Sequence, residues 1–109
     1  MTLQQFEAGL KEAFPDVYES AAPKGKQRYV VWHRYGRSSS YGDDRNQIDA
    51  PKVQLDIVTN VRDDFMVDDF MVDDILAALW MMDLPYSIVS EGYDDDYTAY
   101  RTIVQLVVV

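Results

Sequence analysis

The 109-residue sequence contains no cysteine and no apolar run long enough to span a membrane. The absence of cysteine excludes disulfides and thiolate metal sites, and it favours a reducing interior. The first residues, Met1–Glu7, lack the basic and apolar regions of a signal peptide, so we expect no secretory signal. The length fits one domain, residues 1–109, and a hydrophobic content of 48% is enough for a real core.

Basic residues are few: the chain has 10 Lys and Arg but 19 Asp and Glu, which gives a formal net charge of −9. A protein that grips nucleic-acid phosphates needs a cationic surface, so this balance argues against DNA or RNA binding. Two acidic roles remain compatible with the charge. One is a wall past which DNA slides, and the other is a surface that imitates DNA.

Groups that carry catalysis are also scarce. The single histidine, His33, lies inside a predicted strand, and no serine stands at a recognisable motif spacing, which favours a structural role. No phosphate-binding glycine motif occurs. We therefore predict a protein that is not an enzyme, with no catalytic residues and no cofactor.

Two acidic clusters, Asp43–Asp44 and Asp94–Asp96, offer the oxygen ligands that calcium prefers. Neither cluster has the spaced ligands and the closing glutamate of a calcium-binding loop. We interpret both as solvated turns, in which aspartate has its usual turn role, and we predict no metal site.

The clearest structural pattern is a strand followed by a helix. Apolar and polar residues alternate through Val53–Thr59, which is typical of a strand with one buried face. The stretch from Asp64 to Met82 has no Pro or Gly, and its second half is rich in helix formers. Pro85 predicts the end of this helix, because the residue before a proline avoids the helical region.

The predicted helix contains a repeat, Asp-Asp-Phe-Met-Val, whose period of five rotates its residues around the helix axis. Phe65, Val72 and Leu79 can share one face, while Phe70 and Met81 spread onto another, so the apolar surface is wider than one stripe. The favoured interpretation is that the helix is well buried in its own domain. The alternative is that it also meets another subunit.

A first helix and three further strands complete the expected fold. Thr2 and Gln5 fit a capping box, Pro15 ends the helix that follows, and Asp16–Gln27 is expected to be a connection. The predicted order is α-β-β-α-β-β, a mainly antiparallel four-stranded sheet with two helices packed on it, in an α+β domain. The expected strands are Arg28–Tyr35, Val53–Thr59, Tyr86–Ser90 and Tyr97–Val108, with Leu55, Ile57, Val104 and Leu106 in the core.

Several short segments follow one another in a set order over most of the chain: an early amphipathic helix, Ala22–Pro23, Tyr29–Trp32, Tyr41–Asp44, Val53–Thr59, Gly92–Asp96 and Tyr100–Val104. Each motif is weak alone, but together, in this order and spacing, they resemble the tail-terminator, or tail-completion, proteins of long-tailed bacteriophages. The repeat in the helix is not part of the resemblance.

The resemblance implies an α+β structural virion protein that forms a homo-oligomeric ring, typically a hexamer. Such a ring caps the tail tube, ends its polymerisation and provides the head-joining surface. The implied partners are other copies of the chain, the tail-tube protein and the head–tail connector proteins, while DNA passes through without specific binding. The implied location is the virion tail, after assembly in the cytoplasm of the bacterial host.

Two sets of residues are candidates for contacts in such a ring. Two interpretations of the long polar segment Gly36–Ala50 stay open: an arm that a neighbouring subunit or the tube orders, or a floppy surface loop. The candidate contacts of the arm are Arg37, Tyr41, Asp43, Asp44 and Arg45. The second set lies on the helix, where like charges four residues apart cost roughly 0.2–0.5 kcal/mol per pair. Its members Asp68, Asp69 and Asp73 are the candidate lining of an acidic channel. The alternative is a solubilising face, or aspartates whose charge partners the fold supplies.

Two other functions stay open. One is a head–tail connector joining protein, which uses similar small domains. The other is an acidic inhibitor that mimics DNA and binds a nuclease or regulator. Size under native conditions separates a ring from a monomeric or dimeric mimic.

Overall fold

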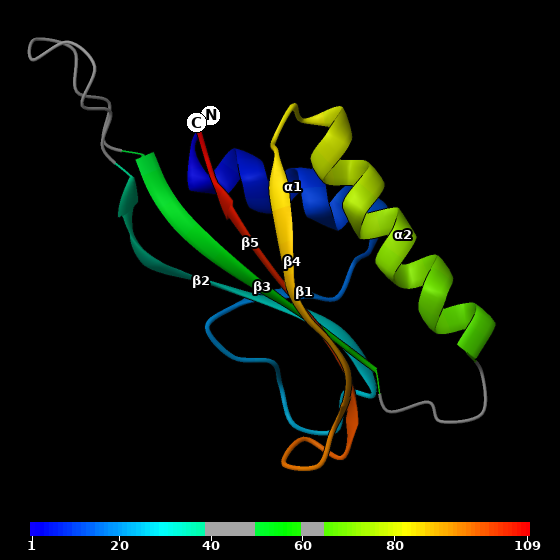
Figure 1. Ribbon diagram of the computed structural model, residues 1–109. Helices are drawn as coiled ribbons and strands as arrows, with labels where there is room; N and C mark the ends of the chain where they lie inside the picture. The colour runs from blue at the N-terminus through cyan, green and yellow to red at the C-terminus, as the bar shows by residue number, and fades with distance from the viewer. Residues whose placement is uncertain (39–49, 60–64) are drawn as a thin grey trace, which may run out of the picture.

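The computed structural model describes residues 1–38, 50–59 and 65–109, with the side chains of 37–38 and 65–70 left outside that description. It is an α+β domain, as predicted, in which two helices lie on one sheet (Figure 1). The helices are α1 (Leu3–Ala13) and α2 (Phe65–Met81). The strands are β1 (Val17–Glu19), β2 (Arg28–Ser38), β3 (Ala50–Thr59), β4 (Tyr86–Asp94) and β5 (Ala99–Val107).

The sheet has five strands in the order β1-β2-β3-β5-β4, and all neighbours are antiparallel except β1 with β2. The predicted four-stranded sheet and its element order are therefore wrong in one respect, since β1 lies in the stretch expected to be a connection. A strand of three residues is too short to show an alternation of apolar and polar residues in the sequence. The pairing of Val17 with Val30, and the burial of Val17, create the strand only in the folded chain.

All four predicted strands have limits that differ from the prediction, and β5 spans Ala99–Val107 instead of Tyr97–Val108. β2 continues to Ser38 and β3 begins at Ala50, so only residues 39–49 of the predicted arm lie outside the described residues. β4 continues to Asp94, through residues expected to form a turn. The reason is pairing, because β5 faces β4 along its whole length and supplies its hydrogen-bond partners.

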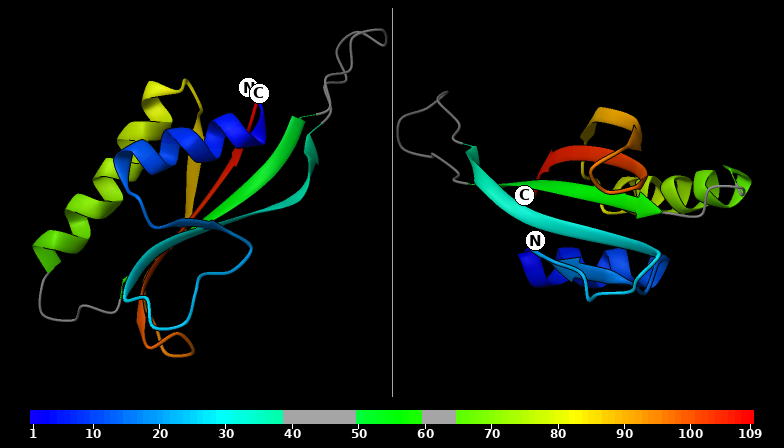
Figure 2. Two further views of the ribbon diagram at one scale, coloured as in Figure 1. Left: turned by 180° about the vertical axis from the view of Figure 1, so that it is seen from behind. Right: turned by 90° about the horizontal axis from the view of Figure 1, so that it is seen from below.

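Both helices cover the same face of the sheet (Figure 2). We call this the core face, because its side chains pack with α1 and α2 in one apolar cluster. The predicted core residues Leu55, Ile57, Val104 and Leu106 are all buried in the domain. The strand facing predicted from the alternation of apolar residues is thus confirmed.

Helix α1 begins with the predicted capping box, in which Thr2 and Gln5 exchange side-chain to backbone hydrogen bonds. The Trp32 indole N–H donates to Glu7 over 2.9 Å, and Phe6 meets the edge of the Trp32 ring. Gly9 lets α1 approach the end of α2, since a Cβ at this position would collide with the sulfur of Met82. These contacts fix α1 on the core face.

Helix α2 buries Met71, Ile75 and Leu79, but its last turn leaves Trp80 and Met81 79% and 82% exposed. The interpretation that this helix is simply buried in its own domain is therefore wrong for the last turn. These residues lie beyond the five-residue repeat, where Trp80, Met81 and Met82 follow one another and leave more apolar surface than the domain covers. Among the residues that the structure describes, no helix is long and apolar enough to cross a membrane.

Candidate interaction surfaces

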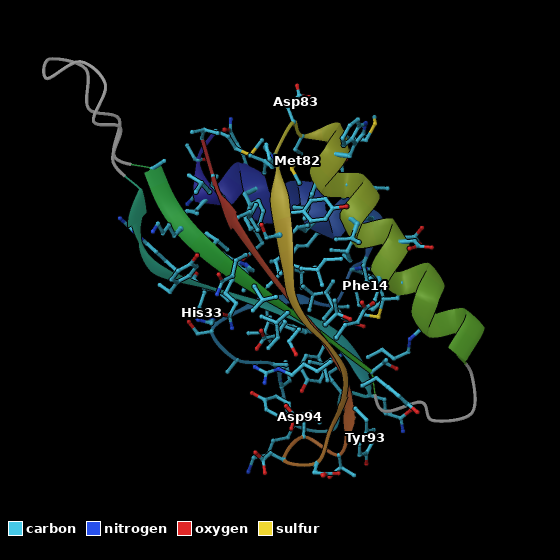
Figure 3. All side chains as sticks on the ribbon, in the orientation of Figure 1. Phe14, His33, Met82, Asp83, Tyr93 and Asp94 are labelled. Carbon is cyan, nitrogen blue, oxygen red and sulfur yellow. The ribbon has the colours of Figure 1, made fainter. Side chains whose placement is uncertain are left out.

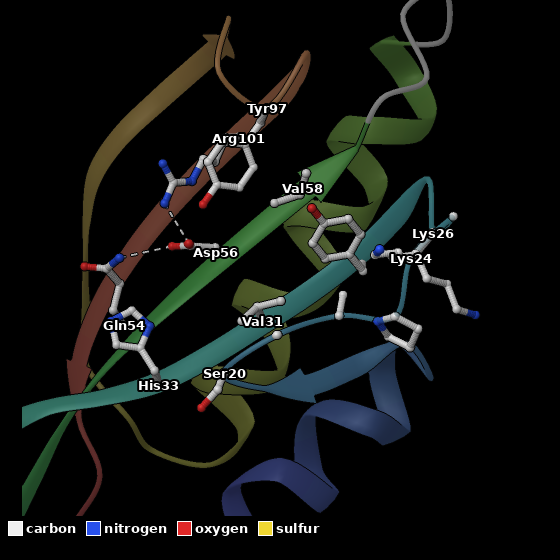
Figure 4. Close-up of a pocket in the computed structure, with 15 residues that line it drawn as sticks. Ser20, Lys24, Lys26, Val31, His33, Gln54, Asp56, Val58, Tyr97 and Arg101 are labelled. Carbon is white, nitrogen blue, oxygen red and sulfur yellow. Dashed lines mark hydrogen bonds and ion pairs between the residues drawn. The ribbon is translucent and has the colours of Figure 1, made fainter.

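The sheet face opposite the helices carries a chain of polar contacts across three strands, and Figure 4 shows its part from Gln54 through Asp56 to Arg101. The Gln105 amide donates to Gln54 over 3.2 Å, and the Gln54 amide donates to Asp56 over 3.1 Å. The Arg101 guanidinium then bridges two carboxylates, Asp56 at 2.7 Å and Asp94 at 3.1 Å. This network joins the central strand β3 to the hairpin of β4 and β5.

Arg101 is mostly buried and its charge is stabilised from several sides. The Tyr97 ring lies 4.3 Å from the guanidinium carbon, close enough for a cation–π contact. Burial alone lowers the pKa of Arg101, but the hydrogen bond and charge of Asp56, together with the hydrogen bond to Asp94 and the nearby Tyr97, leave the pKa above its ordinary value. Burial also raises the pKa of Tyr29, and the nearby Tyr97 and Asp56 raise it further.

An open hollow of about 540 Å³ lies beside this network, between the segment 20–26 and the sheet. Lys24, Lys26 and His33 are among its lining residues, which gives an acidic protein a locally basic patch. Lys26 is paired with Asp16 at 3.0 Å, however, and Asp56 already accepts hydrogen bonds from Gln54 and Arg101. The polar groups here stabilise one another, so we interpret the network as a structural clamp.

The β4–β5 turn is fixed to this clamp through Asp94 (Figure 3). One oxygen of Asp94 accepts from the backbone N–H groups of Asp96 and Tyr97, and the other accepts from Arg101. The predicted turn role of aspartate is confirmed for Asp94. Among the described residues, no group of three or more His, Asp or Glu side chains is arranged to hold a metal ion.

A second surface lies along β4, the edge strand that ends the sheet on the side opposite β1. Every residue of β4 except the last is exposed, including Tyr86, Ile88 and Val89. Trp80 and Tyr86 line a hollow of about 500 Å³ between the last turn of α2 and the start of β4. The exposed apolar side chains of this region are what we call the apolar edge: Trp80, Met81, Tyr86, Ile88 and Val89.

The predicted contact residues are only partly placed. Arg37 belongs to β2, although its side chain is not described, and Tyr41, Asp43, Asp44 and Arg45 lie outside the described residues. Asp68 and Asp69 belong to α2 with side chains outside the description, and Asp73 is exposed. These positions do not test the predicted roles.

Sequence reasoning indicated surplus apolar surface on the helix, including Met81, but it missed the part of the apolar edge that lies on β4. Two signals were present: three large apolar residues, Trp80, Met81 and Met82, occur in a row and cannot share one helix face, and Ile88 and Val89 are adjacent in a strand. No protein-family model matches the chain, and a search of curated proteins finds no match. The surfaces themselves therefore carry the functional argument.

Proposed function

We propose that this chain is a structural ring subunit that caps a phage tail tube, ends tube polymerisation and offers a surface for head joining. The observation that carries the proposal is the apolar edge. Exposed Trp, Met, Tyr, Ile and Val side chains gather there beside a strand whose outer edge has no described partner. Large apolar patches on a soluble domain mark interaction sites, and Trp and Tyr are typical anchors of such sites.

A ring needs two different surfaces on each subunit, because every contact is head to tail. The sheet of this chain supports that requirement. One side of the sheet ends in the long exposed strand β4, while the other ends in the three-residue strand β1. A twofold dimer, in contrast, uses one surface twice and leaves the other end uncovered.

The acidic charge supports a channel that DNA can pass. Asp73 and Asp74 are exposed on α2, and the whole chain has a formal net charge of −9. We propose that Asp68, Asp69 and Asp73 face the channel, where like charge prevents the ring from retaining DNA. Replacing all three by lysine would make the ring hold DNA in a filter-retention assay. An unchanged DNA-free ring would exclude the channel position.

The segment 39–49, which contains Tyr41, Asp43, Asp44 and Arg45, is proposed to contact a neighbouring subunit or the tube. Replacing it by a short Gly-containing turn between β2 and β3 tests this role. The expected product is a folded monomer that neither forms rings nor caps tubes. Normal assembly and normal tail length would show that the segment is only a linker.

The deciding experiment is electron microscopy of tails assembled in the absence of this chain. A terminator predicts tubes far longer than normal, because nothing ends polymerisation. Tubes of normal length that lack heads would identify a connector joining protein instead. Native mass spectrometry of the purified chain measures the size of its assembly. A ring supports the proposal, whereas a stable monomer that competes with DNA for a nuclease supports the DNA mimic.

A further inference from the structure

Besides the outer edge of the three-residue strand β1, two stretches of strand edge lack a pairing strand in the part of the chain that the structure describes. One is the outer edge of β4, which pairs only with β5. The other belongs to the second half of β2, since β1 pairs only with residues 30–32 and the edge of His33–Ser38 is left without a strand. Unpaired edges present rows of N–H and C=O groups that template pairing with another chain.

We propose that β4 of one copy pairs with His33–Ser38 of the next copy, so that the sheets of neighbouring subunits join into one continuous sheet. The inference rests on the proposed ring and specifies its subunit contact. Strand direction supports it. β2, β3, β5 and β4 alternate in direction, so a second copy placed in the same orientation brings its β2 antiparallel to β4.

The edge of β4 has only part of the protection that natural edge strands carry against such pairing, namely one bulge at Val89 and two acidic residues, Glu91 and Asp94. The strand contains neither proline nor lysine, and no described element covers it. Natural edge strands are usually short, charged, bulged away or covered. A nine-residue exposed edge is therefore expected to be paired in the working assembly.

The irregularities of the two strands match each other. β2 has one extra residue, Tyr35, between Arg34 and Gly36, and β4 has one extra residue, Val89, between Ile88 and Ser90. If Arg34 lies opposite Glu91, then Gly36 falls opposite Ser90, and both extra residues flank this pair. The alternation of faces then stays in phase to Ser38 opposite Ser87, which a single unmatched bulge would prevent.

Charge favours the same register. Arg34 lies opposite Val53 and Glu91 lies opposite Thr102, and both partners are buried on the core face, so Arg34 and Glu91 project on that face too. Both side chains are exposed in the single subunit. Across the proposed contact they form an opposite-charge pair. If β4 paired instead with β4 of a second copy, Arg34 would have no opposite charge across the contact and the free edge of β2 would stay unpaired.

The test exchanges the two charges and follows assembly by native mass spectrometry and analytical ultracentrifugation. R34E and E91R should each lower the association constant at least about tenfold, because each places like charges opposite one another. The double variant R34E/E91R should restore association to within about threefold of the wild type. E91R changes the net charge from −9 to −7, so loss of association cannot come from greater overall repulsion.

Mixing the two single variants tests the head-to-tail geometry. In a 1:1 mixture, each contact is either the native pair or the exchanged pair, so alternating rings should form although neither variant assembles alone. Matched controls are E12R and K24E, which make the same charge changes at exposed positions of α1 and the segment 20–26. Both controls should assemble as the wild type does.

A cross-link tests the register directly, since the chain has no natural cysteine. Ser38 and Ser87 of one subunit are separated by β3 and β5, roughly 14 Å across three strand spacings, which is too far for an internal disulfide. Oxidised S38C/S87C should therefore give a ladder of covalent multimers on a non-reducing gel. S38C and S87C alone should give no ladder.

The outcomes separate this inference from the proposed function. The strand pairing is overturned if the wild type assembles while R34E, E91R and the S38C/S87C variant show unchanged association and no ladder; the ring then uses other contacts. A monomeric wild type overturns the pairing and the ring together. Rings with the expected variant behaviour, but tails of normal length without the protein, support the pairing and overturn the terminator role.

Discussion

β3 and β4 contain similar residues but lie in opposite environments. In β3, Val53, Leu55 and Ile57 are at most 1% exposed, because β2 and β5 flank the strand and the helices cover it. In β4, Ile88 and Val89 are 45% and 53% exposed, since the strand has a neighbour on one side only. Residue type therefore does not set burial, whereas the place of a strand in the sheet does.

The contrast assigns different roles to the two strands. Apolar area that is buried within the subunit stabilises the fold of the subunit. Apolar area that remains exposed stabilises nothing until a partner covers it. Substitutions in β3 should therefore change the free energy of unfolding, and substitutions in β4 should change the free energy of association.

Leu55→Ala should have the largest effect on the fold. Removing this fully buried side chain leaves a cavity in the centre of the sheet, at a cost of roughly 2–5 kcal/mol in unfolding free energy. Urea unfolding followed by circular dichroism measures the loss. A loss below about 0.5 kcal/mol would mean that the centre of the sheet is not packed as described.

Arg101→Met should come next, because it removes the link between β3 and the β4–β5 hairpin. Asp56 would keep its charge at a buried position without a guanidinium partner, at a cost of about 3 kcal/mol in unfolding free energy. The double variant D56N/R101M should recover part of this loss, since no buried charge remains. Equal stability of the single and double variants in a denaturant series would contradict the role of the ion pair.

Ile88→Lys, on the edge strand β4, should weaken association between subunits without changing the stability of the single subunit. The exposed side chain contributes little to the subunit, so unfolding free energy should change by less than about 0.5 kcal/mol, while lysine on an edge strand opposes pairing. The expected result is at least about tenfold weaker association in sedimentation experiments. Ala77→Lys, at an exposed position of α2, is the matched control. Unfolding of the I88K subunit at neutral pH would show that β4 supports the core after all.

The smallest expected effect concerns α1 and pH. The hydrogen bond from Lys11 holds the pKa of Glu7 below its ordinary value of 4.5 against the opposing effect of burial, and the Trp32 indole adds to the lowering. Because the folded-state pKa is depressed, this stabilisation is present above about pH 4.5 and is lost as the pH falls through the folded-state value. Glu7→Gln should lower stability more at pH 7 than at pH 3, because the carboxylate is progressively protonated as the pH falls below 4.5. A constant difference at both pH values in thermal unfolding would exclude the carboxylate as the cause.

Local pattern determined much of the fold. Alternation located β3 and its buried side, the capping box located the start of α1, and the stretch without Pro or Gly located α2, which ends one residue before the predicted end. These features were predictable because they depend on residues near one another in the chain. The resemblance to tail terminators also came from local segments, and its functional content stays a proposal.

Tertiary structure alone decided which strands are central and which are at the edge. Period-2 alternation is the same in both places, so no short segment reveals whether β4 has one neighbour or two. The same holds for β1, which exists through its pairing with β2, and for the meeting of Asp56 with Arg101 across 45 residues. The sequence determined the elements and their buried faces, and pairing between distant segments decided the apolar edge, because hydrogen bonds between strands join residues that local patterns do not connect.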